Sequence, residues 1–242
     1  MSEKSAEKPA LLLFPNVLGE IKHHEVFLPE SVAKAVSSID GLIAESEKGG
    51  RRFLSRFETK QLNHMMPLAL FNEQTPDSDI DFYLEPIREG QRWGFVSDGG
   101  LPCIADPGAK LVRRAKQLGI VVQAFVGPSS IIMALMLSGL SGQQFTFHGY
   151  LPKKEDERAC AIKRLERNAK KEGYTQIFIE APYRNKHTLE TLLAELNPET
   201  VLSIAWDLTL PTQGVLTQKV ELWKKSPLPN LDKKCAVFLI GL

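Results

Sequence analysis

The sequence predicts an α/β protein of two domains, the first built on a mostly parallel sheet and the second on a mixed sheet. Short runs of Val, Ile, Leu and Phe alternate with helical patterns along most of the chain, as they do where helices cover both faces of a parallel sheet. Beyond residue 200 the apolar runs follow one another with less helix between them, which indicates antiparallel pairing. The length of 242 residues fits one large domain or two small ones.

Eight apolar runs are expected to be strands, because none shows the strict alternation of a sheet with one exposed face. In chain order they are Leu11–Phe14, Leu42–Ala44, Trp93–Val96, Val121–Val126, Phe145–Leu151, Gln176–Ile179, Val201–Ala205 and Ala236–Ile240. Five segments between them have helical periodicity, and the third of these follows Pro128 and stops at Gly139. These segments are Asp79–Arg88, Ala109–Leu118, Ser129–Leu137, Glu155–Lys171 and Lys186–Leu196.

The segment Gly119–Gly127 is the expected domain boundary, where the second half of the chain begins. We therefore expect a disordered polar tail over residues 1–10, an N-terminal α/β domain over residues 11–118 and a C-terminal α/β domain over residues 119–242. No internal repeat is visible in the sequence.

The composition excludes several classes of protein. Hydrophobic residues at 43% and charged residues at 24% are ordinary for a globular chain, and no apolar run approaches the ~20 residues of a membrane helix. Thirty basic and 29 acidic residues give a net charge of +1, which argues against a globally basic nucleic-acid binder. Cys103, Cys160 and Cys235 are odd in number and far apart, which excludes a disulfide scaffold and argues against a zinc site. We expect a cytoplasmic protein with neither a membrane segment nor a metal.

The segment Phe95–Gly108 (FVSDGGLPCIADPG) carries the most information about function. Its strand ends at Asp98, where open α/β sheets place ligands, and the pair of glycines that follows lets the backbone approach a ligand closely. Asp106 is expected to be the N-cap of the next helix, with Pro107 at the first helical position. The spacing alone is equally consistent with a tight turn and an ordinary capped helix.

Well-known nucleotide and hydrolase motifs are missing. The first strand is followed by FPNVLGE rather than G-x-G-x-x-G, and neither the P-loop pattern nor G-x-S-x-G occurs. Pro102-Cys103 matches the start of the zinc deaminase pattern, but no second cysteine follows it. A dinucleotide site, a P-loop, a nucleophile elbow and a deaminase zinc site are therefore excluded.

Four sequence blocks occur in a fixed order. They are SDGGLPCIADPG from Ser97, VGPSSIIMALMLSGL from Val126, FHGYLPKK from Phe147 and IEAPYR from Ile179, and Asp207-Leu208-Thr209 follows them. In order and spacing these blocks resemble the tetrapyrrole methylase family, most closely its bacterial 16S ribosomal RNA cytidine 2′-O-methyltransferases of the RsmI type. The resemblance extends from about Leu11 to Leu242.

The resemblance implies an S-adenosylmethionine-dependent methyltransferase that acts on a ribose 2′-hydroxyl of ribosomal RNA. It also implies a homodimer, with the cofactor in a cleft between the two domains. The residues expected to bind S-adenosylmethionine are Pro15, Gly19, Asp98, Gly100, Leu101, Ser129, Ser130, Ile131, Ile179, Trp206 and Ala236.

Three residues in matched motifs are candidates for catalysis, namely Glu45, Glu180 and Arg184. A hydroxyl nucleophile profits from a general base, and either Glu45 or Asp98 is suited to that role. An interdomain ion pair between Glu180 and Arg184 is an equally good interpretation of those two residues.

The chain departs from the family pattern mainly on the substrate side. Glu20 replaces an Asn, and Trp206-Asp207 replace Arg-Glu. Lys233-Lys234-Cys235 replaces K-G-E, and Arg51 and Arg52 are displaced in the motif that begins at Ala44. Two alternatives therefore stay open, namely methylation of a small tetrapyrrole-like substrate and a non-catalytic homologue that binds the cofactor or RNA.

Basic residues gather in two places. Lys153–Lys171 holds eight basic and four acidic residues, with Ile162, Leu165 and Ala169 at the spacing of an inward helix face. Arg51, Arg52 and Arg56 form a second basic group. Either group is a candidate to contact RNA phosphates, although a solvated helix face explains the first one equally well.

Two further features are expected to have no chemical role. His23-His24-Glu25 is interpreted as a solvated loop rather than a metal site. Cys103 is interpreted as a small buried residue rather than a nucleophile, because the sequence places no histidine base beside it.

Overall fold

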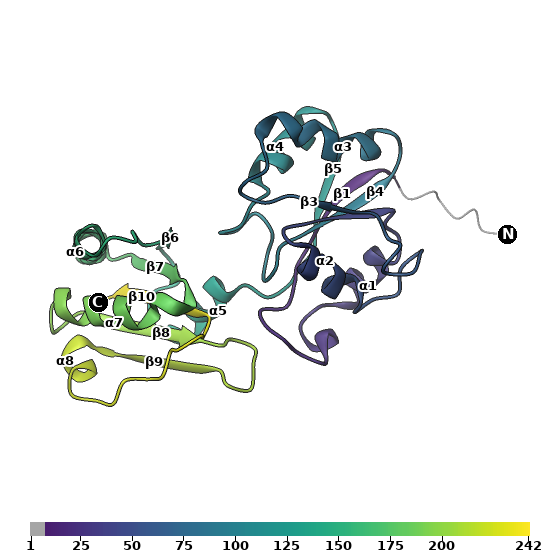
Figure 1. The fold of residues 1–242 in the computed structure, drawn as a ribbon. Helices are drawn as coiled ribbons and strands as arrows, with labels where there is room; N and C mark the ends of the chain where they lie inside the picture. The colour runs from purple at the N-terminus through teal and green to yellow at the C-terminus, as the bar shows by residue number, and fades with distance from the viewer. Residues whose placement is uncertain (1–7) are drawn as a thin grey trace. The chain divides into compact units, whose positions relative to one another are not determined.

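The computed structural model describes residues 8–242, which form two compact units, one ending at Pro128 and the other beginning at Ser129 (Figure 1). The sequence instead suggested a boundary after residue 118. The difference arises because strand β5 (Val121–Ala124) pairs in parallel with strand β1 (Ala10–Phe14) and so completes the first sheet. Most of the expected tail, residues 1–7, lies outside the described residues, and Ala10 already belongs to β1.

The sheet of the N-terminal unit is parallel throughout, as expected. Its strand order is β3-β2-β4-β1-β5, and every neighbouring pair runs in the same direction. The remaining strands are β2 (Gly41–Ala44), β3 (Leu68–Leu70) and β4 (Arg92–Val96). With β1 in an interior position of the sheet, the loop after β1 lies beside the loop after β4.

Two layers of helices cover this sheet because successive side chains of β1 point to opposite faces. Leu12 and Phe14 pack with α1 (Glu30–Val36) and α2 (Glu47–Leu54). Leu11 packs on the other face with α3 (Ile80–Arg88) and α4 (Ala109–Gln117). Figure 1 shows α3 and α4 on one side of the strands and α1 and α2 on the other. Short 3-10 helices, η1 (His24–Val26) and η2 (Asp77–Asp79), lie in the connections.

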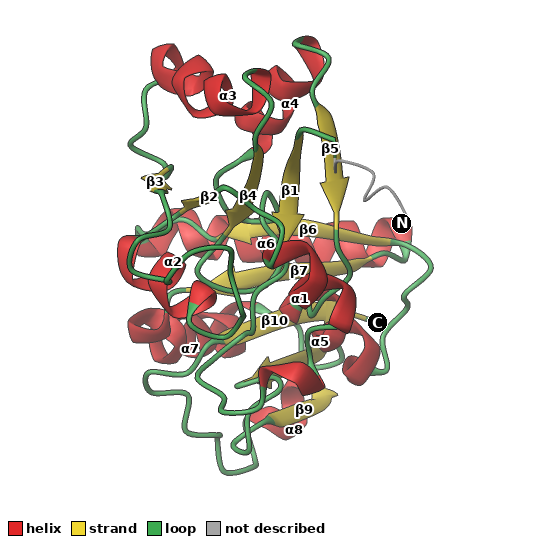
Figure 2. Cartoon of the chain, turned by 90° about the vertical axis from the view of Figure 1, so that its right-hand side faces the viewer, coloured by secondary structure: helices red, strands yellow, loops and turns green. Residues whose placement is uncertain are grey.

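The C-terminal unit holds the mixed sheet that the sequence predicts. Its order is β6-β7-β10-β8-β9, with β6 and β7 parallel and the other pairs antiparallel. Figure 2 labels β6, β7, β10 and β9 of this sheet. The strands are β6 (Phe145–Tyr150), β7 (Thr175–Glu180), β8 (Val201–Trp206), β9 (Gly214–Lys219) and β10 (Ala236–Gly241).

Helices pack against this second sheet as well. Residues of α6 (Glu155–Glu172), α7 (Asn185–Glu195) and α8 (Val220–Trp223) form one core cluster with Phe178 and Phe238. Ile162, Leu165 and Ala169 belong to this cluster, so the inward face expected for α6 is confirmed. Helix α5 (Ser130–Ser138) packs against β8, β9 and β10, and η3 (Pro182–Arg184) joins β7 to α7.

All eight expected strands and all five expected helices occur, with ends that differ by at most two residues. The sequence reading missed α1, α2 and α8 and the strands β3 and β9. Helix α2 (EKGGRRFL) contains two glycines, which are poor helix formers, so its local pattern does not predict it. Within residues 8–242 no helix is both long and apolar enough to span a membrane.

Candidate functional site

Two loops meet at the carboxyl ends of β1 and β4, where an open α/β sheet binds ligands. The backbone N–H of Asn16 donates to the carbonyl of Gly100 (2.8 Å), and the N–H of Gly100 donates to the carbonyl of Asn16 (3.2 Å). Gly100 has a φ of +72°, a conformation that glycine adopts without strain. This bridge brings together the expected cofactor residues of the N-terminal unit, namely Pro15, Gly19, Asp98, Gly100 and Leu101.

Asn16 fixes this arrangement, and the sequence reading did not single it out. Its side chain is buried, and its Nδ2 donates to the carbonyls of Ser97 (2.9 Å) and Asp98 (3.2 Å). Its Oδ1 accepts from the N–H of Val17 (2.9 Å). The only sequence signal was an amide side chain two residues beyond a buried strand. Because its partners lie about 80 positions away, that signal could not reveal the role.

Carboxylates gather at the same edge of the sheet. The N–H of Asp98 donates to Oε2 of Glu45 (3.1 Å), which follows β2. The hydroxyl of Ser46 donates to Oδ1 of Asp98 (2.7 Å) and accepts from the N–H of Gly49 (3.0 Å), so Ser46 also caps α2. A Cβ on Gly49 would lie 2.0 Å from Oδ1 of Asp98, so a larger residue there would displace the Asp98 carboxylate from this arrangement. The expected base candidates Glu45 and Asp98 are thus neighbours.

Asp106 belongs to this carboxylate group, and its expected role as a helix cap is wrong. Helix α4 begins at Ala109 with Gly108 as its N-cap, because the loop takes left-handed turns at Cys103 and Ala105 before it reaches the helix. Burial, followed by the charge of Glu45, raises the pKa of Asp106 to about 6. The local sequence does not indicate a buried carboxylate here, because Asp-Pro-Gly is typical of a helix start.

The group carries excess negative charge. Burial raises the pKa of the Glu45 carboxyl above its ordinary value, and the charges of Asp98 and Glu73 add to the rise while the N–H of Asp98 opposes it. Such a region favours a cation. S-adenosylmethionine carries a sulfonium and an ammonium group, so the residues present fit that cofactor. Among the residues that the structure describes, no cluster of His, Cys, Asp or Glu is suited to a metal ion.

A pocket of about 200 Å³ adjoins the loops on the side of α2. The loop residues Asn16–Glu20 and the side chains of Lys48, Arg52 and Arg56 line it, together with Ser46, Gly49 and Asp98. Arg51, which the sequence grouped with the other two arginines, instead donates to the carbonyls of Asn63 and Met66 (2.8 Å each). The basic group of the sequence is therefore divided between a structural arginine and a pocket.

Glu180 and Arg184 form a buried ion pair inside the C-terminal unit (2.9 Å). The interpretation as an interdomain ion pair is therefore wrong. Oε2 of Glu180 also accepts from the hydroxyl of Thr188 (2.9 Å), and Nη2 of Arg184 also donates to the carbonyls of Leu151 and Pro152 (3.1 Å each). These contacts hold the loop between β6 and α6, and a catalytic role for the two residues stays a prediction.

The expected cofactor residues of the C-terminal unit form a second group. Ala236 at the start of β10 pairs with Trp206 of β8 and with Glu180 of β7, so Ile179 lies at the same end of the sheet. Ser129 caps α5 by accepting from the N–H of Ile132 (3.5 Å), and Ser130 and Ile131 begin that helix.

Residues that depart from the family pattern are partners of one another. Lys234 Nζ lies 2.6 Å from Oδ2 of Asp207, and the hydroxyl of Thr212 donates to the same oxygen (2.8 Å). In the N-terminal unit, Glu20 pairs with Arg52 (2.8 Å). The departures at Asp207 and Glu20 thus each occur with a matching opposite charge.

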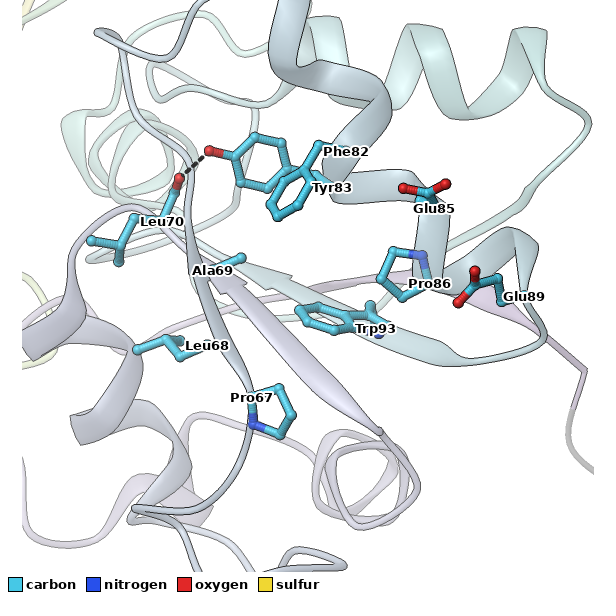
Figure 3. A pocket seen from close by; sticks show the side chains of 10 residues that line it. All are labelled: Pro67, Leu68, Ala69, Leu70, Phe82, Tyr83, Glu85, Pro86, Glu89 and Trp93. Carbon is cyan, nitrogen blue, oxygen red and sulfur yellow. Dashed lines mark hydrogen bonds between the residues drawn. The ribbon is translucent and has the colours of Figure 1, made fainter.

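An apolar groove of about 520 Å³ lies between β3 and α3 (Figure 3). Ala69 and Trp93 lie on the side of the strands and Phe82 and Pro86 on the helix, while the hydroxyl of Tyr83 donates to the carbonyl of Leu70 (2.6 Å). None of the expected site residues lines it.

Cys103 is partly buried, and most of the segment His23-His24-Glu25 is exposed. Burial raises the pKa of the Cys103 thiol to about 11, so the thiol is protonated at neutral pH and a poor nucleophile. His23 and Glu25 contact each other (3.0 Å) with most of both side chains exposed.

Comparison with protein families gives one match over most of the chain. Residues 26–222 match the model for Tetrapyrrole (Corrin/Porphyrin) Methylases. The Ribosomal RNA small subunit methyltransferase I of Thermotoga maritima is 32% identical over 203 residues, which are 82% of this chain and 86% of that protein. The protein of the same name from Bacillus subtilis is 30% identical over 203 residues, which are 82% of this chain and 63% of that protein.

Solved structures share the fold. The methyltransferase CobJ matches with a TM-score of 0.64 at 16% identity over 96% of this chain and 93% of that one. The uroporphyrin-III C-methyl transferase of Thermus thermophilus complexed with S-adenyl homocysteine matches with a TM-score of 0.56 at 12% identity, over 96% of each chain. At these identities the likeness establishes the fold alone.

Proposed function

The chain belongs to the tetrapyrrole methylase family of S-adenosylmethionine-dependent methyltransferases, and from this premise we propose that it methylates a ribose 2′-hydroxyl of ribosomal RNA. Its relatives from Thermotoga maritima and Bacillus subtilis are named for action on the RNA of the small ribosomal subunit. One structural observation carries the proposal: a carboxylate group that favours a cation adjoins a pocket lined by three cationic side chains, and Asp98 belongs to both.

The cofactor is proposed to bind at the loops after β1 and β4. Bound there, S-adenosylmethionine supplies an electrophilic methyl group on a positively charged sulfur. The backbone of Gly100 and Leu101 would contact it closely, and the exposed carboxylate of Asp98 would bind a cationic group. Asn16 holds both loops in register for this contact.

Methyl transfer to a hydroxyl needs an oxygen held in line with the methyl group and an acceptor for its proton. Glu45 is the proposed acceptor. Its raised pKa makes it a stronger base than an ordinary carboxylate, and the N–H of Asp98 fixes the position of its Oε2. In this scheme Glu45 would accept the proton of the hydroxyl group whose oxygen receives the methyl group from the bound cofactor. By resemblance to the family, the active form is proposed to be a cytoplasmic homodimer.

The test combines cofactor binding with methyl transfer. Purified protein is titrated calorimetrically with S-adenosylmethionine and then incubated with labelled S-adenosylmethionine and small ribosomal subunits from a strain that lacks the corresponding gene. Mass spectrometry of nucleosides is expected to show one new 2′-O-methyl nucleoside. Transfer to a porphyrinoid but not to RNA would assign a tetrapyrrole substrate instead. Cofactor binding without transfer to either would identify a non-catalytic homologue.

A further inference from the structure

Three cationic side chains form a stripe along α2 and its C-terminal turn. Lys48, Arg52 and Arg56 are spaced four residues apart, which places them on one face of a helix about 6 Å apart along its axis. All three line the pocket of about 200 Å³ beside the loop after β1. A row of separate positive charges beside a pocket suits a ligand that carries several negative charges in a row.

Arg56 lacks an anionic partner. In the part of the chain that the structure describes, the one hydrogen bond of its side chain runs from Nη1 to Oδ1 of Asn16 (3.3 Å), and no carboxylate lies within ion-pair distance. Burial lowers the pKa of the guanidinium, and the like charge of Arg52 lowers it further, while the charge of Glu20, which is not in contact with Arg56, opposes this. A partly buried cation without an anion is unfavourable. An anion bound in the pocket would remove that cost.

Arg52 has a partner that an incoming anion can displace. Its ion pair with Glu20 (2.8 Å) is largely exposed on the glutamate side, where 81% of the side chain is accessible. Exposed ion pairs contribute little free energy. Glu20 therefore acts as an internal competitor for Arg52 rather than as a permanent partner.

On the other basic surface of the described residues, helix α6, the lysines are paired with carboxylates, whereas Arg164 and Arg167 have no ion pair. On α6, Lys163 pairs with Glu195 (2.7 Å), Lys170 with Glu166 (3.4 Å) and Lys171 with Glu172 (3.1 Å). The lysines of α6 thus offer less free positive charge than Lys48 and Arg56. Only the α2 stripe also adjoins Asn16, whose hydrogen bonds lead directly to Asp98.

We propose that Lys48, Arg52 and Arg56 bind successive phosphate groups of the substrate RNA backbone, and that Glu20 weakens this binding by competing for Arg52. This inference rests on the proposed function and deepens it, because it names the surface that leads the RNA to the strand ends of the N-terminal unit. It also selects the α2 stripe over the basic face of α6.

The probe is a fluorescein-labelled 12-nucleotide oligocytidylate, with binding followed by fluorescence anisotropy between 50 and 200 mM salt. Each lost phosphate contact on a single strand reduces the slope of log K against log salt by about 0.7, which corresponds to about eightfold weaker binding at 50 mM and about threefold at 200 mM. Lys48→Gln and Arg56→Gln are each expected to show this loss. Glu20→Gln is expected to bind more tightly than wild type. Arg56→Lys, which keeps the charge, is expected to retain the slope.

The matched control is Arg167→Gln, which removes an exposed arginine from α6 and is expected to leave the slope unchanged. Thermal unfolding of each variant shows whether it is folded. Wild-type slopes in folded Lys48→Gln and Arg56→Gln, or a reduced slope in Arg167→Gln alone, would overturn the proposal.

The proposed function has its own readout. If wild type methylates ribosomal RNA while the α2 variants keep the wild-type slope, the proposed role of the stripe in phosphate binding is wrong and the proposed function stands. If RNA binding depends on the stripe but no methyl group is transferred, the phosphate-binding role of the stripe stands and the proposed methyl transfer is wrong. If wild type binds cofactor but no RNA, both proposals are wrong.

Discussion

Replacing Asn16 by alanine should destabilise the N-terminal unit and weaken cofactor binding together. The substitution removes three hydrogen bonds within the loops, from Nδ2 to the carbonyls of Ser97 and Asp98 and from the N–H of Val17 to Oδ1, besides the longer one from Nη1 of Arg56. At about 1 kcal/mol for each net hydrogen bond, the free energy of unfolding should fall by about 3 kcal/mol. That is a large share of the roughly 5–15 kcal/mol of a typical domain. The same loss frees the loops after β1 and β4.

The assay for Asn16→Ala is urea unfolding, paired with calorimetric titration of the variant with S-adenosylmethionine. The titration is done without urea, at a temperature where the variant is folded. We expect at least tenfold weaker binding, because the two loops no longer hold their relative position. Asn168→Ala is the control, since it removes an exposed asparagine of α6 and should change the unfolding free energy by less than about 0.5 kcal/mol. A loss below about 1 kcal/mol in Asn16→Ala, with wild-type affinity, would refute the reasoning.

Three further substitutions test the site. Glu45→Gln should lower the rate of methyl transfer by about 10²–10⁴-fold while cofactor affinity is kept, as expected for loss of a general base, and single-turnover kinetics measures it. Asp106→Asn should raise the melting temperature at pH 8 but not at pH 4. The folded-state pKa of about 6 lies above the ordinary 3.8, so the folded protein binds this proton more tightly and loses stability as the pH rises between those values. Glu180→Gln should reduce the unfolding free energy by about 3–5 kcal/mol, because it leaves the Arg184 guanidinium without its buried partner.

Each of these three predictions has a result that would contradict it. An unchanged transfer rate in Glu45→Gln would show that another group accepts the proton. Equal melting temperatures of Asp106→Asn and wild type at pH 8 would show that the ionised carboxylate of Asp106 does not destabilise the folded protein. Glu157→Gln, at an exposed position of α6, is the control for Glu180→Gln. Equal stabilities of these two variants would show that the buried pair is not needed to hold the β6–α6 loop.

The sequence by itself determined the order and type of most elements, because apolar periodicity is a local property. Runs such as Leu11–Phe14 and Phe145–Leu151 are recognisable without knowledge of their partners. Helix α2 was missed because its two glycines hide the pattern, and its inward Phe53 and Leu54 are buried only through contacts with the sheet. The sequence also indicates where the loops of the candidate site lie, since ligands bind where parallel strands end.

Only the tertiary structure shows which side chains contact one another at those loops. Asn16 and Gly100 are 84 positions apart, so no local pattern shows that their backbones pair. The same holds for Glu45 and Asp98, which meet because β2 and β4 are neighbours in the sheet. The prediction that Asp106 caps a helix was wrong for the opposite reason. Its local sequence fits a helix cap, whereas the loop makes left-handed turns before it and the N-cap of α4 is Gly108. Local sequence fixes the conformational preferences of a segment, whereas the charge state and partners of a side chain depend on what the fold places beside it.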